Sequence, residues 1–207
     1  MIQDSERKLW TVRALAGLRD YRWILAAFVG VFAVASVVEL MMGRSLLGPD
    51  GKFGWWDGDI WSRENSQRFA DPYSFSHIVH GILLYWGLWL AARQIPVRLR
   101  LLVALAIEAG WEILENSPLI INRYRAVTIS LGYVGDSVLN SMSDILMMTL
   151  GFLIAARVRP RSSLVLVIAM EVGCALWVRD NLTLNIIMLI HPVDAIRNWQ
   201  LAGRPSL

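Results

Sequence analysis

Apolar runs about 20 residues long are the feature that most constrains the fold of this chain. Such runs occupy 23–42, 76–92, 99–114, 138–156 and 164–178, and a weaker run over 182–190 reaches full length only if it continues to about residue 199. The hydrocarbon core of a bilayer is about 30 Å thick, and a helix needs about 20 apolar residues to cross it. The sequence therefore predicts an all-α, polytopic transmembrane helix bundle of about six spans.

Composition supports a membrane protein with one bundle. The chain has 207 residues, of which 56% are hydrophobic and only 18% are charged, whereas soluble domains contain about 25% charged residues. No polar stretch is long enough for a second domain, so we expect a bundle over 23–200, a basic cytoplasmic segment over 1–22 and a tail over 201–207. The segment 5–20 has an imperfect apolar stripe, which is compatible with an N-terminal helix on the membrane surface.

Basic residues gather in alternate connections. They concentrate in the N-terminal segment and around 93–100 and 157–161, whereas the segment 43–75 carries most of the loop aspartates. Cytoplasmic loops are enriched in Lys and Arg, so the N-terminus is predicted to be cytoplasmic, and six spans would return the C-terminus to the same side. The net charge of +3 is then a consequence of topology, and we expect the lipid bilayer rather than a nucleic acid as the partner.

Ionisable residues interrupt three of the apolar runs at a similar depth. At a rise of about 1.5 Å per residue, His80, Glu112 and Asp144 would each lie within roughly 4–8 Å of the bilayer midplane. Each shares a helical face with other polar side chains three, four or eight residues away. These are His77, Glu108, Glu115, Asp136 and Asn140. Because ionisable groups inside a membrane usually face the bundle interior and mark function, we predict a polar site in the outer half of the bundle.

The residue types favour a metal site. His77, His80 and Asp144 are the predicted ligands, and imidazole with carboxylate suits Zn, Fe or Mn. The carboxylates assigned to catalysis are Glu112, Glu115 and Asp136. Purely structural interpretations stay open: the histidines could hydrogen-bond only to backbone or water, and the carboxylates could form structural ion pairs with arginines. No HExxH or other established catalytic motif is present.

The outer loop 117–136 adds candidate substrate contacts. Pro118 is expected to end the third helix, and Asp136 to cap the fourth. Guanidinium groups around a phenol could hold an anionic lipid or envelope substrate, or equally pair with lipid headgroups. The segment 63–74 could cover the same cavity. The substrate-binding candidates are Arg123, Tyr124, Arg125, Asn140 and Arg179.

Several segments resemble an uncharacterised bacterial inner-membrane family, domain of unknown function 2585, also called uncharacterised protein family 0314. The segments are ENSQ (64–67), SHIVHG (76–81), EAGWEILENSPLIINRYRA (108–126), TISLGYVGDSVLNSMSDILMM (128–148) and RDNLTLNIIMLIHPVDAIRNWQ (179–200). The similarity runs from about residue 40 to 203, and the stretch GKFGWWDGDIWSR (51–63) departs from it. The resemblance implies a multi-pass protein of the bacterial inner membrane and assigns no catalytic residue.

Three classes of function fit these patterns. The first is a metal-assisted hydrolase or transferase that acts on a lipid or envelope substrate. The second is a proton-coupled transporter or channel-like protein, in which buried carboxylates and His80 form a proton path; a homo-oligomer would lessen the objection that six spans without repeats are few. The third is a non-catalytic assembly or scaffold protein whose polar network only fixes helix packing.

Overall fold

The computed structural model describes residues 2–204, with side chains from residue 22 onward. Within that part the chain forms helices and no strand, which confirms the all-α prediction. The helices are α1 (Ile2–Met41), α2 (Ser74–Ala92), α3 (Val97–Glu115), α4 (Pro118–Val127), α5 (Val138–Arg157), α6 (Pro160–Val178), α7 (Leu182–Ile190) and α8 (Asp194–Leu201). The segment between α1 and α2 is irregular, as expected from its turn residues, with an isolated bridge between Trp56 and Ala70.

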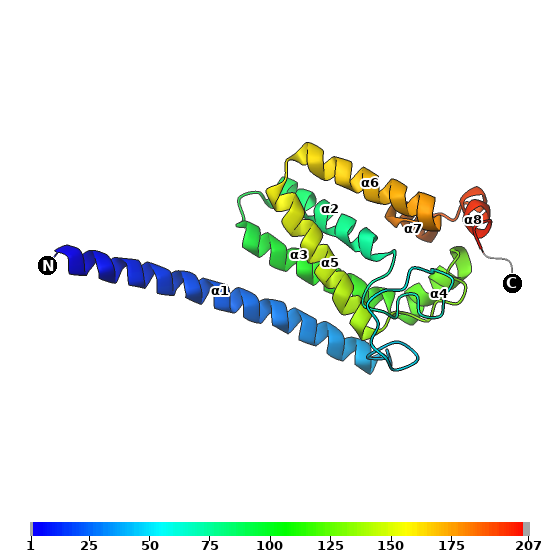
Figure 1. Ribbon diagram of the computed structural model, residues 1–207, viewed down its shortest axis with the longest axis horizontal. Coiled ribbons are helices and arrows are strands. Elements are labelled where there is room, and N and C mark those ends of the chain that lie inside the picture. Colours follow the sequence, from blue (N-terminus) through cyan, green and yellow to red (C-terminus); the bar gives the residue numbers. More distant parts are fainter. Residues whose placement is uncertain (1, 205–207) are drawn as a thin grey trace.

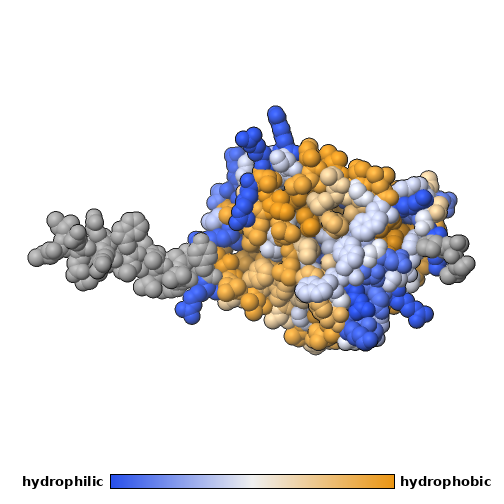
Figure 2. All heavy atoms as spheres, in the orientation of Figure 1, coloured by the Kyte–Doolittle hydropathy of each residue, from blue (hydrophilic) through white to orange (hydrophobic). Residues whose placement is uncertain are grey.

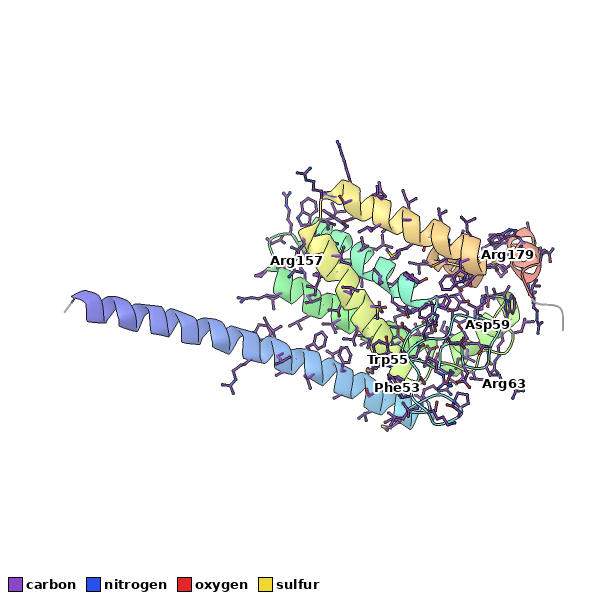
Figure 3. All side chains as sticks on the ribbon, viewed as in Figure 1. Phe53, Trp55, Asp59, Arg63, Arg157 and Arg179 are labelled. Carbon is purple, nitrogen blue, oxygen red and sulfur yellow. The ribbon has the colours of Figure 1, made fainter. Side chains whose placement is uncertain are left out.

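The five long helices run back and forth beside one another. The α2–α3 and α5–α6 connections lie at one end of the bundle, and α4, α7, α8 and the segment 42–73 gather at the other (Figure 1). Arg157 lies at the first end, whereas Asp59, Arg63 and Arg179 lie at the second (Figure 3). This arrangement agrees with the alternation of basic connections along the sequence. Which end faces the cytoplasm stays a prediction.

Four helices are long and apolar enough to cross a membrane: residues 22–41 of α1, and α2, α5 and α6. An apolar band covers the middle of the bundle, with hydrophilic residues at its ends (Figure 2). The helix α3 has 19 residues and runs through the same layer (Figure 1), but its charged side chains keep it outside this group. The helix α1 continues without a break through the basic segment; whether that part lies on the membrane surface stays a prediction.

The sixth predicted span is not confirmed. The helix α7 has nine residues, which at about 1.5 Å per residue reach only about 14 Å, and α8 has eight. Pro192 lies in the turn that separates them, where its ring and missing N–H interrupt helical hydrogen bonding. Both helices lie at the end of the bundle that holds α4 (Figure 1).

The outer loop also differs from expectation at both of its ends. The helix α3 ends at Glu115, and Pro118 begins the additional helix α4, because the fixed φ of proline suits the first helical turn. The helix α5 is capped by Ser137 rather than Asp136: the Ser137 hydroxyl accepts a hydrogen bond from the Asn140 N–H at 3.2 Å. Asp136 is thereby left for contacts outside the helix.

The helices α2 and α5 pack backbone against backbone. A Cβ added to Gly81 would collide with the backbone oxygen of Met148, and one added to Gly151 would collide with that of Ile78. Small residues permit this close approach between apolar helices. Below the polar site, α5 contributes the fully buried Met148 and Phe152 to the apolar core. The two glycines therefore set the separation between the histidines of α2 and the carboxylate of α5.

We expect alanine at Gly81 or Gly151 to destabilise the folded protein by at least about 2 kcal/mol, because overpacking forces the two helices apart. Thermal unfolding in detergent, followed by circular dichroism, measures the effect. The matched control is Gly87→Ala, since a Cβ at Gly87 meets no atom within 4 Å and alanine favours helix. Unchanged unfolding midpoints for both core variants would contradict the close packing.

Candidate functional site

A cavity of about 280 Å³ lies at the end of the bundle that holds α4, bordered by α2, α3, α4, α5, α7 and the segment before α2. That segment contributes Asn65, Ser66 and Tyr73, as expected for a cover over the site. The lining includes seven of the predicted site residues: His77, His80, Glu115, Tyr124, Asp136, Asn140 and Asp144. These predicted residues, from α2, α3, α4, α5 and the segment before α5, therefore lie around a single cavity.

The two histidines meet on one carboxylate that was not among the predicted site residues. Glu108 Oε1 lies 2.7 Å from His77 Nδ1 and 3.1 Å from His80 Nδ1. An ionised carboxylate only accepts hydrogen bonds, so Glu108 can accept from an Nδ1–H group of each imidazole. Ligating histidines are commonly held in this way by a carboxylate behind them. The four-residue spacing of Glu108 and Glu112 was the signal that placed Glu108 on this face.

A second group surrounds the same imidazole. His77 Nδ1 lies 3.5 Å from Glu112 Oε1, and His77 Nε2 lies 3.7 Å from Asp144 Oδ2. Ser74 donates a hydrogen bond of 3.3 Å to Asp144 Oδ1. Glu112 is fully buried, and neither of its carboxylate oxygens accepts a hydrogen bond from the described residues. Since burying an unpaired carboxylate is costly, this cluster requires a proton or a cation.

The positions of the ligand atoms suit a cation. His77, Glu112 and Asp144 each offer one nitrogen or oxygen atom within 4.8 Å of the others, and so do His77, His80 and Glu108. A proton on the imidazole or a cation held between these atoms would each offset the charge of the carboxylates. Glu112 does not line the cavity itself, so the first group lies between the cavity and the interior of the bundle.

Asp136 and Glu115 form a separate part of the cavity wall. The Asp136 carboxylate accepts hydrogen bonds from the Tyr133 hydroxyl at 2.9 Å and from Asn116 Nδ2 at 3.2 Å. Burial raises the pKa of Asp136 to about 7. Glu115 contacts the Tyr124 hydroxyl and the Trp111 side chain. These neighbours place two carboxyl groups among aromatic rings.

The other substrate-binding candidates serve mainly as structural contacts. Arg123 donates two hydrogen bonds to the carbonyl of Leu189, at 2.9 and 2.8 Å, and Arg179 donates one to Trp199. Arg125 donates to the Tyr133 carbonyl, and these three arginines do not line the cavity. The Asn140 amide donates a 2.9 Å hydrogen bond to the backbone of Arg68, which holds the covering segment. Their role in substrate binding stays a prediction.

Asp180 is a further buried carboxylate that the sequence did not single out as a site residue. Its two oxygens accept hydrogen bonds from the Tyr73 hydroxyl at 3.1 Å, from Asn185 Nδ2 at 3.1 Å and from Gln200 Nε2 at 2.9 Å. Burial raises the pKa of Asp180 to about 7. This carboxyl group joins the end of α6 to α7, α8 and the start of α2. Its partners are up to 107 residues away in the chain, so no local pattern could reveal them.

Fold and site together define a helical protein with four helices apolar enough to cross a membrane and a buried cluster of His, Glu and Asp side chains. The chain belongs to the family described as protein of unknown function DUF2585, whose model matches residues 39–202. That match confirms the resemblance and includes the stretch 51–63, which was expected to depart from it.

Relatives named UPF0314 protein are similar along most of their length. The one from Sphingopyxis alaskensis is 45% identical over 189 residues, covering 91% of this chain and 100% of the relative. That from Novosphingobium aromaticivorans is 49% identical over 191 residues, with 90% and 96% covered. That from Rhizobium meliloti is 47% identical over 178 residues, with 86% and 90% covered. No solved structure matches the chain.

The raised pKa of Asp180 predicts that the folded protein loses stability as pH increases. The folded state keeps a proton on Asp180 up to about pH 7, whereas the ordinary pKa is 3.8, so unfolding releases protons between these values and the free energy of unfolding falls as pH rises. We expect a lower thermal midpoint at pH 8 than at pH 5.5. Asp180→Asn should reduce the difference by about 3 °C or more, while Asp59→Asn, at an exposed loop position, should not. An equal pH dependence in all three proteins would contradict this assignment.

Proposed function

We propose that this protein is a membrane-embedded, metal-dependent hydrolase or transferase whose site opens at the outer end of the bundle. The observation that carries the proposal is the cluster of His77, Glu112 and Asp144, in which a fully buried carboxylate lacks a hydrogen-bond donor beside an imidazole. Buried charges in proteins are paired or coordinate metals. Three protein ligands with an open position are typical of catalytic rather than structural metal sites.

Each residue of the cluster has a role in this proposal. His77, Glu112 and Asp144 hold a divalent cation such as Zn²⁺, Fe²⁺ or Mn²⁺. Glu108 accepts from Nδ1 of both His77 and His80, which fixes the imidazole orientation. The cation would lower the pKa of a bound water and so provide a nucleophile at neutral pH. His80 lines the cavity with its Nε2 as a proton acceptor.

Proton transfer at the substrate is assigned to Glu115 and Asp136. Both line the cavity, and the pKa of Asp136, raised by burial to about 7, is near the value at which a group can both accept and donate a proton at neutral pH. The Tyr133 hydroxyl holds one oxygen of Asp136 at 2.9 Å. The substrate would be a lipid or another component of the cell envelope, since the cavity lies at one end of the apolar band.

A transport function is less well supported by this conformation. Beyond the cluster, the middle of the bundle is filled by Leu105, Met148 and Phe152, each with no exposed surface. A proton or cation path that continues from Glu108 toward the other end would have to pass this apolar layer. The closed inner half therefore favours chemistry at a pocket over passage through the bundle.

We also propose five membrane crossings, by α1, α2, α3, α5 and α6. The helix α3 is the one proposed crossing whose composition is not sufficiently apolar. It can still cross, because Glu108 and Glu112 are buried inside the bundle, where they do not meet lipid. Its lipid-facing side carries exposed apolar residues such as Val103 and Ile107. An odd number of crossings with a cytoplasmic N-terminus places α7, α8 and the cavity on the outer side of the bacterial inner membrane.

Metal content tests the proposed function. Elemental analysis of detergent-purified protein should find nearly one equivalent of Zn, Fe or Mn per chain in the wild type, and at least about tenfold less in His77→Ala and Glu112→Gln. The matched control is His191→Ala, which removes an exposed histidine outside the cavity. Circular dichroism and size-exclusion chromatography confirm that each variant is folded.

The proposal fails if folded wild-type protein, purified without chelators and then incubated with each metal, retains none above the level of His77→Ala. Full biological function of Glu112→Gln and His80→Gln would instead identify the cluster as a packing network, as the scaffold hypothesis requires.

Topology is tested by labelling single cysteines in intact cells. With Cys174 replaced by serine, a cysteine at Arg204 is expected to react with a membrane-impermeant maleimide from outside. A cysteine at Arg159, in the α5–α6 connection, is expected to react only after the membrane is broken. Equal protection of both positions would support an even number of crossings and contradict the five-crossing arrangement.

A further inference from the structure

The composition of the cavity wall restricts the charge of its ligand. Three carboxyl groups line the cavity, and none of its described lining residues is Lys or Arg. The aromatic lining residues are Tyr73, Trp111, Tyr124 and Tyr133. A wall of this kind is electronegative at the carboxylates and also at the faces of the rings. Beside these carboxylates and rings an anionic group would meet repulsion and no Lys or Arg side chain.

The aromatic and acidic residues form one connected part of the wall. The Tyr124 and Tyr133 rings lie edge to face, with centroids 5.3 Å apart. The Tyr133 hydroxyl donates to Asp136 at 2.9 Å, and the hydroxyl of Tyr124 contacts Glu115. We call Trp111, Glu115, Tyr124, Tyr133 and Asp136 the aromatic–acidic wall. The hydroxyl groups are directed to carboxylates, so the rings keep fixed positions around the cavity.

The nearby arginines do not supply positive charge to the cavity wall. The guanidinium group of Arg123 is bound to the carbonyl of Leu189 through two nitrogen atoms, and Arg125 to the carbonyl of Tyr133. Neither side chain lines the cavity. A phosphate or carboxylate inside the cavity would therefore lack the bidentate guanidinium contacts that such groups usually receive.

We propose that the aromatic–acidic wall binds an organic ammonium group, either a protonated amine or a quaternary ammonium. Aromatic faces attract such cations, and several rings beside carboxylates are a recurrent way to bind choline-like groups. This inference rests on the proposed function and names its substrate class: the ammonium group lies against the rings and Glu115 of the aromatic–acidic wall, and the bond to be cleaved lies toward Asp136, His77 and Asp144. The ammonium group can belong to a lipid headgroup or to a free amine.

Isothermal titration with choline, with its neutral isostere 3,3-dimethylbutan-1-ol and with inorganic phosphate tests this proposal on detergent-purified, metal-replete protein. The detergent carries no amine or choline group. We expect choline to bind at least about tenfold more tightly than the isostere, and phosphate not to compete with it. Equal affinity for the charged and neutral compounds, or tighter binding of phosphate, would overturn the proposal, as would no binding of choline or of the lipid below.

Substitutions in the aromatic–acidic wall test whether its rings and carboxylates bind choline or only support the fold. Trp111→Leu is expected to weaken choline binding about fivefold or more, whereas Trp111→Phe, which keeps an aromatic face, should retain most of it. Glu115→Gln should also weaken binding without changing the size of the side chain. The matched control is Trp89→Leu, at a residue of α2 that does not line the cavity. Unchanged binding in folded Trp111→Leu and Glu115→Gln would contradict the assignment to this wall.

A short-chain lipid separates the two sources of the ammonium group. If a headgroup is bound, dihexanoyl phosphatidylcholine should compete with choline at a concentration below its micellar threshold and at least about tenfold more strongly than free choline. Competition no stronger than that of choline assigns the wall to a free amine. Metal content is measured on the same samples: metal without ammonium binding overturns only this inference, and ammonium binding without metal overturns only the proposed metal chemistry.

Discussion

The close contact between α2 and α5 is the constraint on which the rest of the site depends. Gly81 and Gly151 bring the two backbones together, and the polar side chains one to two turns closer to the start of each helix then meet across the interface. His77 and Asp144 face each other at 3.7 Å because the helices cannot separate without losing the packing beneath them. The rigid apolar contact between α2 and α5 thereby holds the polar side chains of the two helices close together. Functional sites commonly need such support from the packing around them.

Charge burial is the second constraint, and the chain meets it in two ways. Asp136 and Asp180 receive hydrogen bonds from neutral donors, including Tyr133 and Tyr73, and lie outside the long helices. Glu112 receives none from the described residues. Glu39 is likewise fully buried without a hydrogen-bond donor among the described residues, but Glu112 also lies beside an imidazole. The proposed cation would satisfy Glu112, as buried polar groups usually are.

The sequence predicted well the helices that consist of long apolar runs. It predicted less well the features that depend on contacts between residues far apart in the chain. The apolar runs located the five long helices, and the depth argument brought His80 and Asp144 to one cavity. The sixth predicted span is not confirmed, because α7 ends two residues before Pro192. The helix α4 was predicted as a loop, because Pro118 can either end one helix or begin another. Glu108 lay on the predicted face but was not ranked as a site residue, since only its contact with both imidazoles distinguishes it from Glu112 and Glu115. Tyr124 was predicted because two arginines flank it, whereas Tyr133 has no such signal in the sequence.

A cation at each end of the cavity would resolve its electrostatics. Glu112 and Asp144 need positive charge near His77, and Glu115 and Asp136 are surrounded by rings and hydroxyl groups rather than by arginines. A divalent metal at the first pair and an ammonium group at the second would allow all four carboxylates to be ionised in a setting of low dielectric, where each unpaired charge is costly. Arg123 and Arg179, which were expected to bind an anionic substrate, donate hydrogen bonds to the backbone at the end of α7 and in α8, and their role in substrate binding stays a prediction. Under the two proposals together, the cavity would bind a ligand that brings positive charge, and the negative part of a zwitterionic headgroup would lie toward the metal.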